Sequence, residues 1–464
     1  MSNWLPDLST QSGPKYKAIA SAIEADIAAG RLAAGARMPT HRDLAWRLKV
    51  TVGTVARAYV EAERMGLLSG EVGRGTFVTD PGRRAEPALS TYLAAAWSPQ
   101  PDIVNLAVNR PGGDQGAWAV APVLERLAAR PDLPQLLNYN LDLVALGHRR
   151  AGALWLRDEG VDANPEQVSV TAGSQLAIVA ALATFSRAGD TVLAEEYTYP
   201  GFKSAAALLG RQVVGVAVDD EGLVPEEVER AFQKGARFLY TIASLQNPLT
   251  PTLSAARRQA IADLARRYDA FVIEDGVHRF LEPDSPPVIQ AFAPERSLYL
   301  TTLSKSVSPG LRTAFTHVPL EWKARFDAAI GALSLAQPIP LIEVARILIE
   351  EGTAQEAARR QRDEVIVRQQ LAGQILGAQV LPKGPAFNLW LPMADPWTSH
   401  SFAAAAARHG VNLAPTDSFA VGRPQHDGIR VSLTAPPDRS TLERGLRILS
   451  NLLATGPGHA PPTI

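Results

Sequence analysis

Short apolar runs of strand length alternate with longer helical stretches over much of the chain beyond residue 103. The runs are VSVTA, DTVLAEE, QVVGVAV, RFLYTIA, AFVIED and SLYLTTLS, and the stretches between them include QLAIVAALATFSRAG and SAARRQAIADLARRY. Such alternation is typical of an α/β fold, in which a mostly parallel sheet carries helices on both faces. Residues from about 345 to 455 are more helical, with strand candidates FNLWLP and GIRVSLT, which predicts a second, smaller α+β domain.

The first 80 residues follow a different pattern, of three helices and a hairpin. Residues 15–29 place apolar side chains on one helical stripe. Thr40 is a predicted N-cap for HRDLAWRL, and Thr51 is a predicted N-cap for VGTVARAYVEAERMG. The segment LLSGEVGRGTFV is typical of two short strands around a glycine-rich tip. This order of elements predicts a winged helix-turn-helix.

The distribution of charge supports this prediction. Six basic residues and one acid, Asp43, lie between Arg31 and Arg57, although the whole chain has a net charge of −1. Contacts of basic side chains with phosphates dominate affinity for DNA. A local basic surface therefore indicates double-stranded DNA as a partner, and the total charge argues against a protein that coats nucleic acid along its whole length. A small helical domain with an ordinary solvated face is the alternative.

The composition excludes several other classes of protein. The chain has no cysteine, which rules out disulfides, thiolate chemistry and cysteine-based metal sites, and we expect no metal site of any kind. The start, MSNWLPDLST, has neither the basic nor the apolar region of a signal peptide. No run approaches the ~20 apolar residues that a membrane span needs. We therefore expect a soluble, cytoplasmic protein.

Polar residues collect where the predicted strands end. The segments concerned are TAGSQ (171–175), EEYTYPG (195–201), SLQNP (244–248), Asp275 and SKSVSPGLR (304–312). In sheets of this kind, ligands bind beyond the carboxyl ends of the strands. Gly173 would let a backbone come close, and the helix start after it offers free N–H groups to a phosphate. Each feature alone is usually a helix cap or a solvated side chain. Their order and their shared position at strand ends indicate a ligand site.

Together these residue types describe a pyridoxal-phosphate site. Lys305, on a loop rich in serine, proline and glycine, would attack an aldehyde if it were partly desolvated. Thr302, Ser304 and Arg312 would hold a phosphate dianion beside it. Asp275 would keep a pyridine nitrogen protonated, which makes the ring an electron sink.

The chain resembles two known families joined end to end. Residues 103–455 resemble the fold-type-I pyridoxal-phosphate aminotransferases. MPTHRDLAWRLKVTVGTVARAYVEAERMGLLSGEVGRGTFV matches the GntR-type winged helix over nearly its whole length. Both in this order resemble the MocR-type regulators. The resemblance implies a DNA-binding domain at 1–80, a linker at 81–102, an aminotransferase-like domain at 103–455 and a disordered tail at 456–464.

The resemblance also implies a role for each matching residue. Lys305 would form the Schiff base, Asp275 would pair with the pyridine nitrogen, and Tyr199 would stack on the ring. Arg430 would clamp a substrate α-carboxylate, a bidentate task that suits a guanidinium. Asn247 would reach the ring's O3′ and adjoin the substrate. The implied phosphate ligands are Arg312, Thr302, Ser304, the backbone of Gly173 and Ser174, and Tyr139 from the partner subunit of a homodimer. The implied DNA contacts are Arg42, Thr51, Thr54, Arg57, Gly73 and Arg74.

Two departures from the family pattern bear on activity. The family's QNPTG is QNPLT here. The stretch after Asp275, which usually supplies a tyrosine to O3′, contains Gly276, Val277 and His278 instead. The phenol is missing, and His278 is the candidate substitute.

Three functions are compatible with these features. The first is a transcriptional regulator that senses an amino acid or amine by transimination at Lys305. The second is an active aminotransferase with an attached DNA-binding domain, whose turnover would be weak or partial without the tyrosine. The third is a binding module that has lost the chemistry and keeps the fold for dimerisation. The presence of Lys305 favours the first two.

Overall fold

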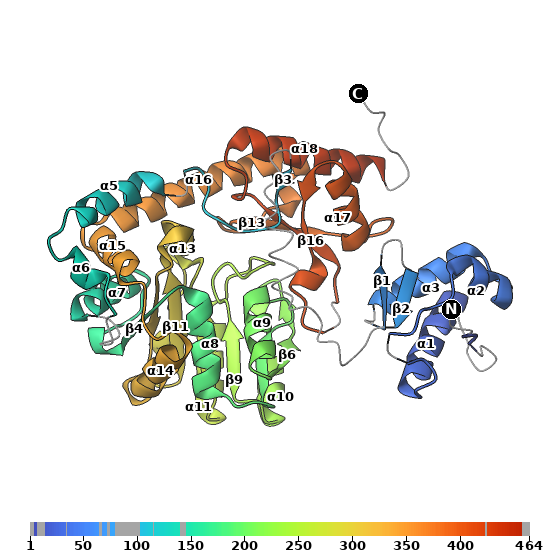
Figure 1. Ribbon diagram of the computed structural model, residues 1–464, viewed down its shortest axis with the longest axis horizontal. Coiled ribbons are helices and arrows are strands. Elements are labelled where there is room, and N and C mark those ends of the chain that lie inside the picture. Colours follow the sequence, from blue (N-terminus) through green and yellow to red (C-terminus); the bar gives the residue numbers. More distant parts are fainter. Residues whose placement is uncertain are drawn as a thin grey trace. The chain divides into compact units, whose positions relative to one another are not determined.

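Two compact units, Met1–Pro87 and Ala88–Ile464, make up the chain in the computed structural model (Figure 1). The structure describes residues 4–6, 14–33, 35–64, 67–71, 75–78, 103–114, 116–139, 145–422 and 425–456. The predicted linker and most of the predicted tail lie outside these residues, so the predicted domain limits remain predictions.

The first unit is a winged helix-turn-helix, as predicted. Its elements are α1 (Lys15–Ala28), α2 (His41–Leu48), α3 (Val52–Arg64), β1 (Leu68–Glu71) and β2 (Gly75–Val78), the two strands being antiparallel. Thr40 caps α2 by accepting from the Asp43 N–H at 3.2 Å, and Thr51 accepts from the Thr54 N–H at 3.1 Å. Lys49 adopts a left-handed φ of 55° and makes the tight turn between α2 and α3.

A small apolar core holds the first unit together. Ile19 and Ile23 of α1 pack with Leu44 of α2 and Val55 of α3, and all four are fully buried. The hydroxyl of the buried Tyr59 donates to the Pro39 carbonyl at 2.9 Å. The apolar stripe predicted for residues 15–29 is therefore the face of α1 that packs on the recognition helix α3.

The second unit is built on a seven-stranded sheet in the order β4-β12-β11-β10-β9-β5-β6. The strands are β4 (Val168–Thr171), β5 (Thr191–Glu195), β6 (Gln212–Val216), β9 (Phe238–Thr241), β10 (Phe271–Asp275), β11 (Ser297–Thr302) and β12 (Ala314–His317). β12 is antiparallel to both neighbours, and the remaining pairs are parallel. The apolar runs predicted six of these strands but missed β12, a four-residue strand close behind the Pro-Gly pair of the lysine segment.

Helices cover both faces of this sheet, as the alternation predicted (Figure 1). Val192 packs with α8 (Ser174–Phe185), α9 (Pro200–Leu208) and α14 (Leu320–Leu333) on one face. Its neighbour Leu193 packs with α10 (Pro225–Gln233) and α11 (Ala255–Arg267) on the other. The further helical elements of this part are α5 (Ala117–Ala128), α6 (Leu133–Leu136), α7 (Leu146–Asp158), α12 (Ile289–Phe292), α13 (Leu303–Ser306), α15 (Ile339–Glu350), η1 (Pro165–Gln167), η2 (Arg279–Leu281) and η3 (Pro309–Leu311). A two-residue hairpin pairs β7 (Val218–Asp219) with β8 (Gly222–Leu223).

A smaller α+β part follows at the C-terminal end, also as predicted. It contains α16 (Thr353–Leu376), η4 (Ala378–Val380), β13 (Asn388–Pro392), α17 (Ser399–Arg408), β14 (Val411–Asn412), β15 (Ala414–Pro415), η5 (Thr416–Ser418), β16 (Gly428–Ser432) and α18 (Arg439–Thr455). Its antiparallel sheet has the order β13-β16-β15. β3 (Val104–Asn105) pairs in parallel with β14, so residues near the start of the described second unit join this smaller part. Among the described residues, no helix is long and apolar enough to cross a membrane.

Candidate cofactor site

A cavity of about 360 Å³ brings together most of the predicted cofactor and substrate residues. Those that line it are Ser174, Tyr199, Asn247, Asp275, His278, Thr302, Ser304, Lys305, Arg312 and Arg430. They come from the ends of the central strands and from β16 of the smaller part. Segments that are far apart in the sequence therefore meet at one place, between the two parts of the second unit.

One corner of the cavity is suited to an anion. Gly173, with a φ of +91°, directly precedes α8, and a Cβ built on it would lie only 2.3 Å from Nη2 of Arg312. Arg312 Nη2 also donates to the Ala172 carbonyl at 3.3 Å. A guanidinium thus lies against the start of a twelve-residue helix, where free N–H groups and the helix dipole favour negative charge.

Lys305 lies in a one-turn helix, not on the loop that the sequence predicted. Thr302 caps this helix, α13, by accepting from the Ser304 N–H at 3.2 Å. The Thr302 hydroxyl also donates to the Thr313 carbonyl at 2.9 Å. This cap fixes the backbone at Lys305. It was not predicted, because the serine, proline and glycine content of the segment favoured a loop.

The environment of Lys305 favours its neutral, nucleophilic form. Burial, followed by the positive charges of Arg430 and Arg312, lowers its pKa from 10.5 to about 8. Its Nζ donates a hydrogen bond to the Asn109 carbonyl. At pH 7 about 9 % of such a lysine is neutral, against about 0.03 % at the ordinary pKa, so Lys305 is poised to attack an aldehyde.

This lowered pKa gives a prediction for pH dependence. Below pH 7, covalent capture of pyridoxal phosphate by the cofactor-free protein will slow about tenfold for each pH unit, because only neutral Lys305 reacts. The rate will level off above the pKa of about 8. Stopped-flow absorbance checks this, with a free lysine derivative as the control for titration of the cofactor itself. A rate that keeps rising to pH 10 contradicts it.

Asp275 occupies the buried end of β10. Its carboxylate accepts from the Tyr240 hydroxyl at 2.6 Å and from the Val277 N–H at 3.1 Å. Burial raises its pKa to about 6, and these hydrogen bonds and the charge of Lys305 oppose the rise. The carboxylate is therefore still mostly ionised at neutral pH. Sequence reasoning missed Tyr240, whose signal was a polar hydroxyl within the buried strand FLYT that needed a partner.

His278 lines the cavity in a neutral form. Burial lowers its pKa to about 4, and its Nδ1 lies 2.9 Å from the Leu245 carbonyl. A carbonyl can only accept, so Nδ1 carries the proton and Nε2 is an acceptor. His278 therefore does not reproduce the hydrogen-bond donor that a tyrosine would supply here.

Arg430 is fully buried and already hydrogen-bonded. Its Nη1 donates to Asn247 Oδ1 at 2.9 Å, its Nη2 donates to the Ala107 carbonyl, and its guanidinium carbon lies 4.6 Å from the centre of the Phe419 ring. These contacts hold the guanidinium in one plane. A ligand carboxylate would have to compete with the Ala107 carbonyl for it.

The segment 107–110, of which residues 108–110 form a wall of the cavity, was missed by sequence reasoning. Carbonyls of Ala107 and Asn109 accept from Arg430 and Lys305, and Arg110 lines the same cavity. The Asn109 side chain donates to Asn388 Oδ1 of β13 at 2.7 Å. Backbone carbonyls leave no signature in a sequence, so only the structure could show this wall.

The charges around the cavity call for an anionic ligand. Four cationic side chains line it, those of Arg110, Lys305, Arg312 and Arg430, against one carboxylate, that of Asp275. A cleft lined mainly by charges of one sign attracts ligands of the opposite sign. A phosphate monoester that carries an aldehyde would supply two negative charges and a target for Lys305, so the residues fit pyridoxal phosphate.

Tyr139 lies apart from this group. It follows α6, is 75 % exposed and does not line the cavity. Its predicted role requires a second subunit, so that role remains a prediction.

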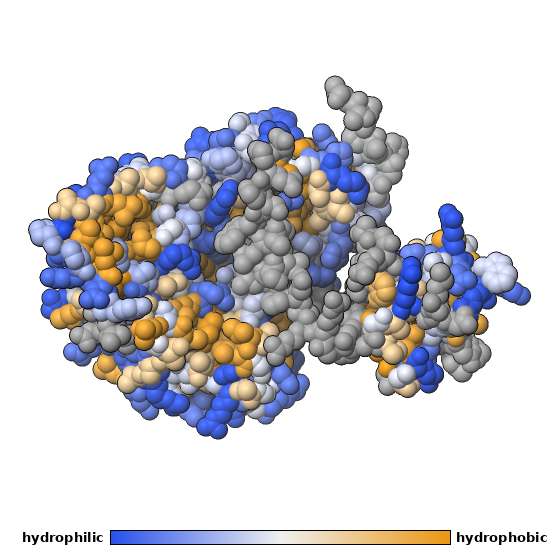
Figure 2. Space-filling model, in the orientation of Figure 1, coloured by the Kyte–Doolittle hydropathy of each residue, from blue (hydrophilic) through white to orange (hydrophobic). Residues whose placement is uncertain are grey.

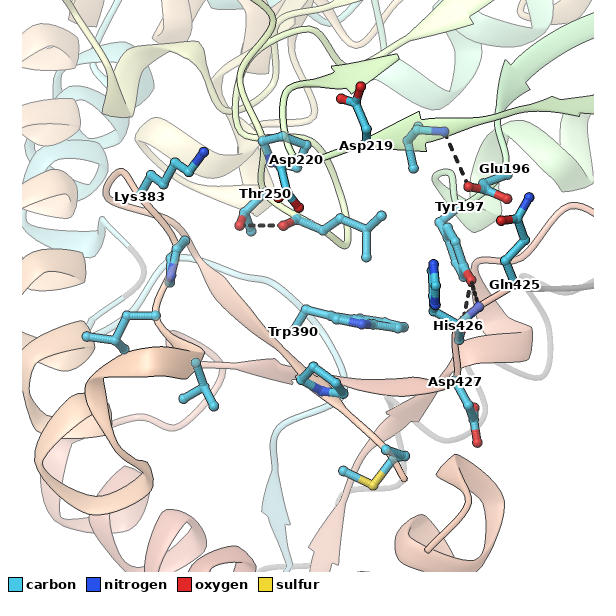
Figure 3. Close-up of a pocket in the computed structure, with 18 of the residues that line it drawn as sticks. Glu196, Tyr197, Asp219, Asp220, Thr250, Lys383, Trp390, Gln425, His426 and Asp427 are labelled. Carbon is cyan, nitrogen blue, oxygen red and sulfur yellow. Dashed lines mark hydrogen bonds between the residues drawn. The ribbon is translucent and has the colours of Figure 1, made fainter. Parts of the chain in front are cut away.

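A second cavity, of about 770 Å³, adjoins the first without sharing its chemistry. Trp390 lies across its middle, Asp219 and Asp220 lie above it in the view, and Glu196 lies apart from them, beside Tyr197 (Figure 3). Although it is larger, it holds none of the predicted cofactor residues. We therefore assign the cofactor chemistry to the smaller cavity.

The predicted DNA-binding residues can be placed only in part. Arg42, Thr51 and Arg57 are exposed on the first unit, and Gly73 and Arg74 lie outside the described residues. The guanidinium of Arg57 stacks 4.3 Å from the centre of the Tyr16 ring. The hydroxyls of Thr51 and Thr54 bond to each other at 2.8 Å, so both help to start α3.

The basic surface is smaller than the sequence count implied. Arg31 pairs with Asp26 at 2.5 Å, and Arg47 lies 3.6 Å from Asp43. Asp26 precedes the segment over which the charges were counted. Arg42 and Arg57 have no ion pair within the described part of this unit, so they are the stronger candidates for phosphate or base contacts.

Family models match both units. Residues 101–449 match the model for aminotransferase class I and II, and residues 15–78 match that for bacterial regulatory proteins of the gntR family. The uncharacterized HTH-type transcriptional regulator YdeF of Bacillus subtilis is 30 % identical over 456 residues, which cover 97 % of each chain. The chain belongs to the MocR-type regulators.

Other relatives agree with this family. The vitamin B6 salvage pathway transcriptional repressor PtsJ of Salmonella typhimurium is 29 % identical over 92 % of this MocR-type chain and 96 % of its own. The kynurenine aminotransferase of Pyrococcus horikoshii has the same fold, with a TM-score of 0.72 and 22 % identity over 80 % of this chain and 95 % of that one. The cofactor of the MocR-type aminotransferase domain is pyridoxal 5′-phosphate, which the charges of the cavity also favour.

Proposed function

We propose that this MocR-type regulator binds a DNA operator through its winged helix and senses an amino acid or amine at Lys305. The observation that carries the proposal is the meeting of Lys305, Asp275 and Arg430 in one cavity of a chain that also has a DNA-binding domain. Binding would change the affinity for DNA only if the ligand-bound and ligand-free states differ in their affinity for the operator.

Four side chains of the cavity, and the start of α8, have defined tasks in this proposal. Bound pyridoxal phosphate supplies an aldehyde that can exchange one amine for another. Arg312 and the start of α8 hold the phosphate, and Asp275 keeps a proton on the ring nitrogen. Lys305 would hold the cofactor through the aldehyde, and its neutral amine would be the group that an effector amine replaces. Arg430 orients the effector's carboxylate.

The segment 107–110 supplies a route for the signal. Lys305 and Arg430 both donate to its carbonyls, and both would exchange those contacts for contacts with cofactor and effector. The same segment continues from β3, which pairs with β14 in the smaller part. Ligand binding would thus alter the hydrogen bonds of the first described residues of the second unit.

The active protein is a homodimer in this proposal. In the space-filling view, apolar side chains gather over the helices around α5 and α15 (Figure 2). Leu124 of α5 and Leu137, close to Tyr139, are 43 % and 68 % exposed. A partner subunit on this surface would cover them and bring Tyr139 towards its phosphate. The dimer would bind paired half-sites, and sedimentation of the purified protein tests it.

An active aminotransferase is the second candidate, because Lys305, Asp275 and Arg430 are the groups that transamination needs. His278 counts against fast turnover, since its acceptor nitrogen replaces a donor. A coupled assay with an amino acid and excess keto acid separates the two functions. The sensor function expects no sustained release of product, because exchange of the effector with Lys305 releases no keto acid, whereas sustained turnover without any effect on DNA binding would favour the enzyme.

DNA binding by the winged helix can be tested at Arg57. We expect Arg57→Ala to weaken operator binding about tenfold at fixed salt, because one charged contact is worth about 1–3 kcal/mol. Cofactor absorbance should not change. Arg31→Ala is the matched control, since Arg31 already pairs with Asp26 and should matter less. An equal loss in both variants would mean that only net charge counts, and loss of cofactor would mean that the domain limits are wrong.

A further inference from the structure

Arg110 is the one cation of the cofactor cavity that the proposed function leaves without a task. It lies on the wall segment next to Asn109, and its Nε donates to the Ala435 carbonyl at 2.9 Å. Its two terminal nitrogens remain available, and none of the described carboxylates lies within ion-pair distance of them. A guanidinium with a free fork at a ligand cavity is suited to bind a planar anion.

The acceptor that holds Arg110 is itself fixed. Ala435 lies in the loop after β16, and the buried Arg368 donates to the carbonyls of Leu433 at 3.1 Å and Pro436 at 2.8 Å on either side of it. The N–H of Ala435 also donates to Ser432 Oγ at 3.3 Å. Arg110 is exposed, but the hydrogen bond from its Nε to the Ala435 carbonyl restrains the direction in which its two terminal nitrogens point.

The charges of the cavity side chains indicate which kind of group Arg110 would bind. In the proposed function Arg312 takes the phosphate, Arg430 takes the effector's α-carboxylate, and Asp275 faces the ring nitrogen. Lys305 loses its charge when it bonds to the aldehyde. Arg110 is exposed, whereas Arg430 is buried in the same cavity, so Arg110 lies on the solvent side of it. The one positive charge without a partner, that of Arg110, therefore lies away from the atoms that react at Lys305.

We infer that the effector carries a second anionic group, which Arg110 binds: it is an amino acid with an acidic side chain. This inference rests on the proposed function, because it names the ligand of the same site. An arginine that is merely solvated at the rim of the cavity would instead leave the site indifferent to the effector's side-chain charge.

The test compares pairs of amino acids that differ only in the distal group. Aspartate against asparagine, glutamate against glutamine and phosphoserine against serine are titrated into the full-length, cofactor-loaded protein, and cofactor absorbance reports binding. Both members of a pair share the α-amino and α-carboxylate groups, so the affinity ratio isolates the distal charge. We expect at least one acidic member to bind about tenfold or more tighter than its neutral partner, which a charged hydrogen bond allows.

Three variants assign that ratio to Arg110. Arg110→Gln should lower the affinity ratio to about one. Arg110→Lys should retain part of the ratio, because the positive charge remains although the paired nitrogens of the guanidinium are lost. Arg447→Gln, at an exposed arginine of α18, should leave it unchanged. Equal binding within every pair, or a ratio that survives in Arg110→Gln, overturns the inference while the proposed function stands. If neither these amino acids nor a panel of simple amines changes the absorbance, the proposed function fails and the inference fails with it.

Discussion

Replacement of Lys305 by alanine will abolish covalent attachment of pyridoxal phosphate to the protein. Since no lysine is then left for an amine to release, it will also abolish the response of DNA binding to amines. The chemistry has no substitute for this side chain, because the cavity has no other lysine among its lining residues. The phosphate contacts at Arg312 and at the start of α8 remain, so the cofactor will still bind, but more weakly and without a covalent bond. The fold should survive, since the only hydrogen bond that the structure gives Lys305 Nζ is to the Asn109 carbonyl.

Reduction with borohydride followed by peptide mapping checks this expectation. The label in the wild-type protein should be on Lys305, and none should be on Lys203. Lys203 is the matched control, because burial lowers its pKa to about 8 as well, but it donates to the Ala420 carbonyl at 2.6 Å and lies outside the cavity. Label on Lys203, or a normal cofactor band in Lys305→Ala, would contradict the assignment.

Replacement of Arg258 by methionine will cause the largest loss of stability that we expect from a single change. Arg258 is fully buried and pairs with Glu274 at 2.8 Å. It also donates to the carbonyls of Leu253 and Ala243 at 3.0 and 2.9 Å. Removal would leave Glu274 as an uncompensated buried charge, which costs about 3–5 kcal/mol of unfolding free energy.

The pair Arg266–Glu295 provides the control, because Arg266 lies on the same helix, α11, but the pair is exposed. Arg266→Ala should lose less than about 1 kcal/mol. Urea unfolding followed by circular dichroism measures both variants. If Arg258→Met does not fold, Arg258→Lys, which keeps a positive charge beside Glu274 but loses most of the hydrogen bonds of the guanidinium, should fold and lose less. Equal losses at the buried and exposed pairs would contradict this account.

The sequence predicted the framework because its signals are local. Apolar runs revealed six of the seven central strands, and Thr40 and Thr51 marked the starts of two helices of the winged helix. β12 was missed because four residues after a Pro-Gly turn carry no clear periodicity. Lys305 was predicted on a loop because the composition of its segment outweighed the cap at Thr302.

The sequence could predict those parts of the site that are formed by side chains. Lys305, Asp275, Arg312 and Arg430 follow strand ends or lie within a strand, and the structure places all four at one cavity. Contacts made through the backbone could not be predicted, since the carbonyls of segment 107–110 are common to every residue type. Ion pairs were also hidden, as Asp26 of α1 shows by pairing with Arg31 just beyond the end of that helix.

The most direct test of the central claim is an anisotropy titration of the DNA upstream of the protein's own gene, at fixed salt. The cofactor-loaded wild-type protein and Lys305→Ala are each titrated with and without a panel of amino acids and amines. The account predicts selective binding to this DNA, with an affinity that one amine changes in the wild-type protein and not in Lys305→Ala. Selective binding that no amine alters, or that the same amine alters equally in Lys305→Ala, would contradict sensing at Lys305.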